Sequence, residues 1–159
     1  MKVLGIDPGF DRLGIALLDN ELGRERLIYS QCFETTRTDA LNARLLALGM
    51  RVEALMREHK PDAVGIETLF FNTNQKTAIG VAEARGIIIY LAELHGSTVY
   101  EFGPQEIKIA VTGYGKSDKK AVIAMTKRLV PESPEDALDD EYDAIAVGIT
   151  CLAHRGRSQ

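Results

Sequence analysis

The N-terminal stretch KVLGIDPGFDRLGIALLD constrains the fold more than any other part of this chain. Residues 2–7 and 13–19 are rich in the branched apolar side chains that are typical of buried strands. Between them, Pro8 fixes the backbone φ angle and Gly9 tolerates positive φ, which favours a tight turn. The stretch therefore predicts two antiparallel strands joined by a short turn, with one carboxylate, Asp7, where the first apolar strand ends.

The rest of the chain adds one more antiparallel strand and then alternates between helices and strands. Apolar residues recur at spacings of three and four between Leu41 and Met56, which predicts a helix from residue 39 that ends before Pro61. The other expected elements are strands at 26–34, 62–67 and 97–102 and helices at 77–94, near 104–111, at 118–129 and at 137–154, with Pro104 and Ser117 as start signals. Together they predict an α/β fold, a five-stranded mixed sheet with helices on both faces, formed by residues 1–159 as one domain.

Composition narrows the class of protein. The chain has 159 residues, of which 45% are hydrophobic and 26% are charged, as in a globular domain with a substantial core. It contains no apolar run of about 18 residues and no signal-sequence pattern at its N-terminus, so we expect a cytoplasmic protein with no membrane partner. Cys32 and Cys151 lie far apart in the sequence and have no CxxC spacing, which disfavours both a disulfide bond and a zinc site.

Three further carboxylates stand in positions as unusual as that of Asp7. Glu67 ends the short strand DAVGIE, while Asp140 and Asp143 lie three residues apart near the start of the last helix and so share a face. If the strand that ends at Glu67 pairs with the first strand, Asp7 and Glu67 come close, since neighbouring strands lie about 4.8 Å apart. The pattern thus predicts four carboxylates at one end of the sheet.

Such a cluster must either raise the pKa values of its carboxyl groups or bind cations. Two carboxylates about 5 Å apart repel each other by roughly 3 kcal/mol at an effective dielectric constant of about 20. A site of oxygen ligands without His or Cys favours Mg²⁺ or Mn²⁺, and two such ions commonly serve in-line displacement at phosphorus. Other interpretations remain for each residue alone: Asp140 and Asp143 as helix N-terminal acids, Glu67 as a solvent-facing charge, and Asp7 as a turn residue.

Six motifs along almost the whole chain resemble those of the RuvC family, the bacterial Holliday junction resolvases. They are GIDPG at 5–9, IETLFFNTN at 66–74, AEARG at 82–86, YEF at 100–102, IKIAVTGYGKSDKKAV at 107–122 and DEYDAIAVGIT at 140–150. The motifs stand in the family's order and at its spacing. The resemblance implies a ribonuclease H-like fold and a homodimer that resolves four-way DNA junctions in recombination and repair, by paired symmetric nicks in strands of like polarity.

The resemblance also implies residue roles. Asp7, Glu67, Asp140 and Asp143 fall on the family's catalytic positions, where they bind two Mg²⁺ ions per active site, with Mn²⁺ as a substitute. The implied partner is the branch-migration motor formed by RuvA and RuvB. Whether the flanking Asp139 and Glu141 assist the site is open.

An aromatic loop is implied to contact DNA. Phe70 matches the family's aromatic at the junction centre, where a ring can stack on an unpaired base. Phe71 is its neighbour, and either of the two can face the DNA while the other joins the core. Asn74 lies in the same loop, where it either reaches the DNA backbone or stabilises a turn.

The net charge of −4 argues mildly against a nucleic-acid partner, but lysines gather in the third quarter of the chain. Lys108 and Lys119 match functional lysines of the family, and Lys116 is a further candidate for binding DNA. A local basic stripe can bind phosphate on an acidic protein, and two divalent cations bring the formal charge to zero. AVTGYGKS at 110–117 resembles a phosphate-binding loop but lacks its first glycine, so we do not expect nucleotide binding there.

The helix at 77–94 is apolar on nearly all sides, which predicts a subunit interface in addition to a buried face. Two other functions remain as alternatives. One is a ribonuclease H-like nuclease that acts on structured RNA precursors, which the Phe-Phe loop and the two matched lysines disfavour. The other is an actin-like ATPase half-domain, suggested by GIDPG before a hairpin, although such enzymes need a second domain for which the chain is too short.

Overall fold

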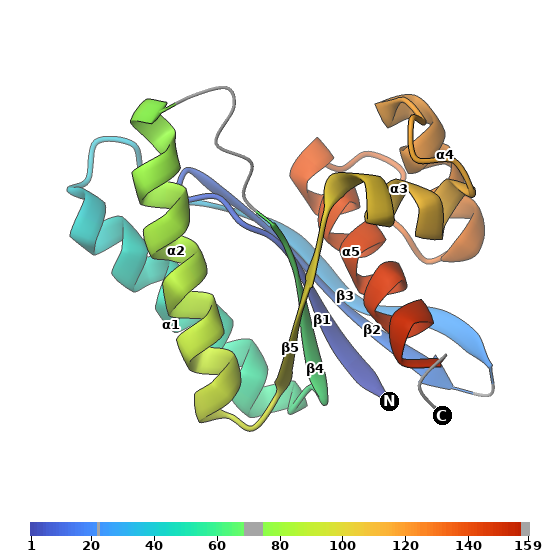
Figure 1. Cartoon of the computed structure of the whole chain (residues 1–159). Helices are drawn as coiled ribbons and strands as arrows, with labels where there is room; N and C mark the ends of the chain where they lie inside the picture. The colour runs from blue at the N-terminus through green and yellow to red at the C-terminus, as the bar shows by residue number, and fades with distance from the viewer. Residues whose placement is uncertain (22, 69–74, 157–159) are drawn as a thin grey trace.

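A computed structural model describes residues 1–21, 23–68 and 75–156, and its centre is a five-stranded mixed sheet (Figure 1). The strand order is β3-β2-β1-β4-β5. β1 pairs antiparallel with β2 and β2 with β3, whereas β1, β4 and β5 run parallel. This is the expected ribonuclease H-like arrangement. The strand bounds are Lys2–Asp7 (β1), Arg12–Glu21 (β2), Arg24–Glu34 (β3), Ala63–Glu67 (β4) and Thr98–Phe102 (β5).

Helices cover both faces of the sheet. α1 and α2 lie together on one face, and α3, α4 and α5 lie on the other (Figure 1). There is one hydrophobic core on each face of the sheet. The inner strands β1, β2 and β4 contribute side chains to both cores, because successive side chains of a strand point to opposite faces. The helix bounds are Leu41–His59 (α1), Gln75–Leu94 (α2), Pro104–Thr112 (α3), Lys119–Leu129 (α4) and Asp139–Gly156 (α5).

The central strand β1 shows how the two cores are built from one sequence. Leu4 and Ile6 are fully buried in the core beneath α1 and α2. Val3 is fully buried in the core beneath α5. Because β1 has partners on both edges and helices on both faces, its last residue, Asp7, is held by a rigid backbone.

α5 lies unusually close to the sheet because glycines face each other there. A Cβ atom on Gly5 would lie 2.3 Å from the carbonyl oxygen of Ala144 and 2.6 Å from the backbone nitrogen of Gly148. A Cβ atom on Gly148 would lie 2.3 Å from a methyl carbon of Leu18. Backbone therefore packs directly on backbone, which brings the start of α5 near the end of β1.

All the expected strands and helices are present, with bounds that differ from the expected ones by up to two residues; α1, for example, begins at Leu41 and α5 at Asp139. A different capping residue is found at the start of α4. Asp118, not Ser117, caps this helix, since its carboxylate accepts a hydrogen bond of 2.8 Å from the backbone N–H of Ala121. The Ser117 hydroxyl instead donates to the carbonyl oxygen of Tyr114 within the preceding turn, at 2.8 Å. Pro104 does begin α3, as expected. Among the described helices, none is long and apolar enough to span a membrane.

Candidate functional site

Four carboxylates from three elements meet at the carboxyl ends of β1 and β4. Asp7 ends β1, and Glu67 ends β4, its parallel neighbour. Ile6 pairs with Ile66 in the register, so the two acids that follow them stand side by side. Asp140 and Asp143 lie in the first turns of α5, which packs across these strands. Segments far apart in the sequence thus bring their acidic side chains to the same end of the sheet.

Asp7 is the electrostatic centre of this cluster. Burial, and then the negative charges of Asp143, Glu67 and Asp140, raise the pKa of Asp7 from 3.8 to about 8. Burial, followed by the charge of Asp143, also raises the pKa of Glu67. Burial raises the pKa of Asp143 as well, although Lys119 acts in the opposite direction. The carboxylates therefore lie close enough to repel one another, as a cation-binding site requires.

This repulsion predicts a pH dependence of stability in EDTA. Because Asp7 binds its proton near pH 8 in the folded chain and near pH 4 in the unfolded chain, the folded state holds more protons between these values. The unfolding free energy should therefore fall as pH rises from about 4 to about 8. One pKa unit corresponds to about 1.4 kcal/mol, so the cost at high pH is on the order of 5 kcal/mol.

Urea denaturation of the wild type and Asp7→Asn between pH 5 and pH 9 measures this effect. The advantage of Asp7→Asn should grow with pH, and an advantage that stays constant over the whole range would contradict the raised pKa. The difference between the two proteins cancels the contributions of groups that titrate alike in both.

Gly14 allows α5 to approach the acids. Asp7, Gly14 and Cys32 are paired in one row across β1, β2 and β3. A Cβ atom on Gly14 would lie 1.9 Å from the carbonyl oxygen of Asp140 and 3.1 Å from Cβ of Asp7. The first turn of α5 therefore rests on bare backbone, and any larger residue at position 14 would push Asp140 away.

Lys119, at the start of α4, neutralises part of the cluster. Its Nζ lies 3.1 Å from Oδ2 of Asp139 and 3.2 Å from Oδ2 of Asp143. Lys119 and Lys108 line a pocket together with Glu67 and Asp143, and both lysines lower the pKa of Glu67 against the larger effect of burial. Two of the three lysines predicted to bind DNA thus lie beside the acids, on the β4 side of Asp7. Lys116 is exposed on the turn between α3 and α4 and is not among the lining residues of this pocket.

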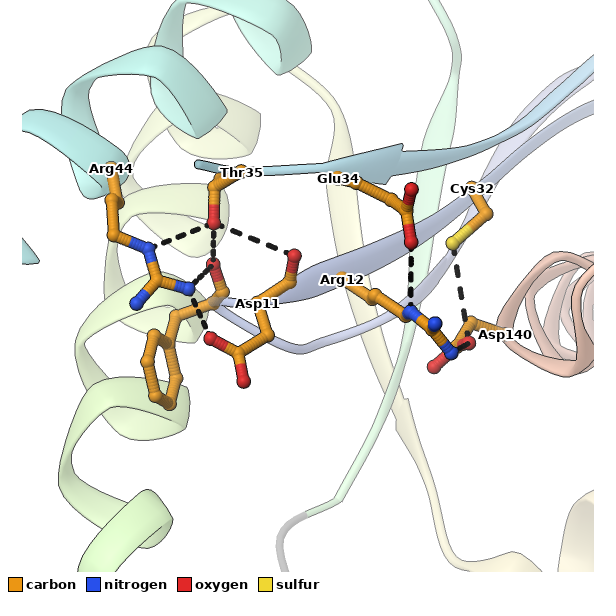
Figure 2. A network of polar contacts seen from close by, with 8 residues as sticks. Asp11, Arg12, Cys32, Glu34, Thr35, Arg44 and Asp140 are labelled. Atoms are coloured by element: carbon orange, nitrogen blue, oxygen red, sulfur yellow. Dashed lines mark hydrogen bonds and ion pairs between the residues drawn. The ribbon is translucent and has the colours of Figure 1, made fainter. Parts of the chain in front are cut away.

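Arg12 on β2 and Cys32 on β3 both contact Asp140 (Figure 2). Nη1 of Arg12 lies 3.8 Å from Oδ2 of Asp140, and Nε of Arg12 donates a hydrogen bond of 2.9 Å to Glu34. The Cys32 thiol lies 4.0 Å from the same oxygen of Asp140. The pKa of Cys32 is raised to about 11 by burial and then by the charge of Asp140, so the thiol is neutral and can donate to this carboxylate.

A second network fixes the turn that follows Asp7 (Figure 2). Arg44, which is buried in α1, pairs with the carboxylate of Asp11 and donates from Nε to the Thr35 hydroxyl at 2.9 Å. Its Nη2 also donates to the carbonyl oxygen of Phe10, and its guanidinium lies 4.7 Å from the centre of the Phe10 ring. A buried charge is costly unless it is paired in this way. Arg44 therefore anchors the turn after Asp7 to α1, and this anchoring also restrains the backbone of Asp7.

The donor set fits hard divalent cations. Asp7, Glu67, Asp140 and Asp143 offer only oxygen ligands, and Asp7 is buried beside like charges that a cation would offset. Within residues 1–21, 23–68 and 75–156, no three His, Cys, Asp or Glu side chains are gathered tightly enough to enclose an ion. In this arrangement Asp143 contacts Lys119 and Asp140 contacts Arg12.

The structure also places residues that the sequence interpretation left open or did not identify. Asp139 pairs with Lys119, while Glu141 accepts a hydrogen bond of 2.5 Å from Ser30 on β3 and is thereby tied to the sheet. Arg12 and Gly14 were not predicted, because only pairing across three strands brings them to Asp140. Phe70, Phe71 and Asn74 lie outside the described residues.

Comparisons with known proteins agree with this geometry. The family described as "Crossover junction endodeoxyribonuclease RuvC" matches residues 3–151. A protein of that name from Alkaliphilus metalliredigens is 40% identical over 159 residues, covering 100% of this chain and 96% of the relative. The structure of Thermus thermophilus RuvC superimposes with a TM-score of 0.91 at 27% identity, covering 99% of this chain and 97% of that one.

The Thermus protein has also been solved in complex with a Holliday junction substrate. That structure superimposes with a TM-score of 0.92 at 26% identity and covers 99% of this chain and 96% of the other. The match extends over both the acidic cluster and the helices around it. By family match, by full-length relatives and by structure, this chain belongs to the RuvC family of crossover junction endodeoxyribonucleases.

Proposed function

We propose that this protein resolves Holliday junctions by paired symmetric nicks in two strands of like polarity, in DNA recombination and repair. The observation that carries the proposal is the convergence of Asp7, Glu67, Asp140 and Asp143 around a buried strand end. Mutually repelling carboxylates destabilise a fold, so their gathering in one place is accounted for by a charged ligand. Membership of the RuvC family supports a four-way DNA junction as the substrate.

Mg²⁺ is the cofactor that the four acids suit best, with two ions per active site and Mn²⁺ as a substitute. Asp7, Glu67, Asp140 and Asp143 would hold these ions, with Asp7 fixed at the end of the central strand. When bound, such ions supply activation of the attacking water and stabilisation of the leaving oxygen. The protein's own part is to hold the carboxylates in place, and the two backbone contacts at Gly14 and Gly5 provide that rigidity.

DNA contacts are proposed for three lysines and for residues of the segment before α2. Lys108 and Lys119 are placed to meet phosphates next to the cleavage site, because they share a pocket with Glu67 and Asp143. Lys116 would extend this basic surface. In the segment before α2, Phe70 or Phe71 would stack on an unpaired base, an interaction that contributes about 1–3 kcal/mol, and Asn74 would contact the DNA backbone.

A homodimer is proposed through α2, so that two active sites face two strands. Ile79, Tyr90 and Leu94 are 68%, 64% and 58% exposed, and spacings of eleven and four place them on one stripe of the helix. Exposed Gly86 lies on the same stripe and has open space where a Cβ would be. A stripe of large apolar side chains with a glycine at its middle suits close packing of two copies. The branch-migration motor of RuvA and RuvB is the proposed larger partner.

Tyr90→Asp should dissociate this dimer. Burying an uncompensated carboxylate at a helix-helix contact opposes association by more than about 1.4 kcal/mol, which is a tenfold weakening at least. Analytical ultracentrifugation over a dilution series measures the dissociation constant. Leu46→Asp, on the equally exposed part of α1, is the matched control and should leave the constant unchanged. A wild type that stays monomeric at every concentration would contradict the dimer.

Cleavage of a synthetic four-way junction beside a linear duplex of the same arms tests the proposed function. With Mg²⁺ we expect symmetric nicks confined to the junction and no cutting of the duplex, and with EDTA no cutting of either. A structured RNA in parallel tests the alternative substrate. If RNA is cut and the junction is left whole, the DNA resolvase proposal is wrong.

A further inference from the structure

Arg12 stands next to the acidic cluster without a role in the proposed chemistry. It is the first residue of β2, five positions after Asp7, and its guanidinium lies between Glu34 and Asp140 (Figure 2). β2 flanks β1 on one side, while β4, Glu67 and the lysine pocket lie on the other. Arg12 and Lys119 therefore stand on opposite sides of Asp7.

The geometry leaves one edge of the Arg12 guanidinium available. Nε donates its hydrogen to Oε1 of Glu34 at 2.9 Å, which fixes the plane and direction of the group. Nη1 lies 3.8 Å from Asp140, within ion-pair range but too far for a hydrogen bond. The side chain is 42% exposed. Glu34 thus acts as an anchor, and the terminal nitrogens remain oriented toward the acidic cluster and solvent.

Such an edge matches a phosphodiester group. The parallel N–H groups of a guanidinium bind phosphate oxygens in a fork, and their planar arrangement is retained while Nε stays bonded to Glu34. The contact to Asp140 is easily given up, because exposed ion pairs at this distance contribute little free energy. A DNA strand whose cleaved phosphate lies at Asp7 would present a neighbouring phosphate on the β2 side.

We propose that Arg12 binds the DNA backbone at a phosphate adjacent to the cleaved one, on the side of Asp7 opposite to Lys119. The inference rests on the proposed function, since it presumes that a DNA strand crosses the four acids. The cluster would then be bordered by one cation on each side. Arg12 exchanges its contact with Asp140 for a phosphate when the strand arrives, and Asp140 is released to turn into the site.

Junction binding in EDTA at several salt concentrations tests this role apart from cleavage. Arg12→Gln keeps a polar side chain that can donate hydrogen bonds but shortens it and removes its charge. Arg24→Gln makes the same change at an exposed arginine at the far end of β3 and is the matched control. For Arg12→Gln we expect affinity to fall about tenfold. The slope of log K against log salt should become less steep by about 0.9 for each active site that engages the junction. Arg24→Gln should match the wild type, and Arg12→Lys should restore the slope with only part of the affinity.

The outcomes separate the two proposals. If the wild type prefers the junction over the duplex but Arg12→Gln keeps the wild-type slope, Arg12 makes no phosphate contact and the inference is overturned while the function stands. Slower cleavage with an unchanged slope also overturns it, because Arg12 then acts only on Asp140. A wild type without any preference for the junction overturns the function and the inference together.

Discussion

Replacing Asp7 by asparagine should abolish junction cleavage while leaving junction binding intact. Asparagine has nearly the same shape, so the buried end of β1 keeps its packing, but it lacks the negative charge that the proposed ions require. Metal ions contribute several kcal/mol of transition-state stabilisation, and a loss of about 4 kcal/mol slows a reaction roughly 1,000-fold. Single-turnover cleavage with Mg²⁺ and a binding assay in EDTA measure the two properties separately.

The control for this variant is Asp136→Asn, which makes the same chemical change on an exposed loop before α5. It should cleave at the wild-type rate. We expect Asp7→Asn to remain folded, since removal of a buried carboxyl whose pKa is raised to about 8 should increase stability in EDTA at pH 8, and urea denaturation checks this. Cleavage by Asp7→Asn within tenfold of the wild type would exclude Asp7 as a central ligand.

Gly14→Ala should reduce both stability and cleavage. The new methyl group would lie 1.9 Å from the carbonyl oxygen of Asp140, a backbone atom that moves only if the start of α5 moves. Overpacking of this kind costs about 1–3 kcal/mol. A displacement of about 1 Å at a catalytic group can slow a reaction roughly 100-fold. Urea denaturation in EDTA and single-turnover cleavage of the folded protein measure the two effects.

Gly49→Ala in α1 is the comparison for this effect. There the added Cβ would meet only a methyl group of Ile87 at 3.1 Å, and that side chain can adjust. Its stability should change by less than about 1 kcal/mol and its cleavage rate should not change. A Gly14→Ala protein with wild-type stability and activity would mean that α5 does not depend on bare backbone at this position.

The helices and strands could be predicted because each is specified by a pattern in its own consecutive residues. The apolar periodicity of α1 and the apolar stretches of β1 and β2 are written in consecutive residues, so their bounds agree closely with the structure. The start of α4 was wrong by one residue because Ser117 and Asp118 are both good capping residues, and only the turn at Tyr114 decides which side chain faces the helix. The local sequence pattern cannot decide which of two adjacent residues caps a helix when both have side chains suited to capping.

The acidic cluster was predictable in part. Its convergence followed from parallel pairing of β1 with β4 and from the spacing of Asp140 and Asp143. Lys119 was named only through the family resemblance, and Arg12 was not predicted at all. These two residues approach from α4 and β2 and have no fixed spacing from the acids that they contact. Their positions depend on how the helices pack.

The sequence by itself determined the antiparallel pairing of the first three strands, the layers and the identity of the four acids, because hydrophobic periodicity and short connections restrict how this chain can pair and pack. The positions of β4 and β5 in the sheet came from the structure. The tertiary structure alone decided how close the acids come and which cations face them. Those distances depend on missing Cβ atoms at Gly5 and Gly14, which let α5 rest directly on the sheet. How closely α5 approaches the sheet depends on the side chains of both, so neither the sequence of the helix nor that of the strands reveals it alone.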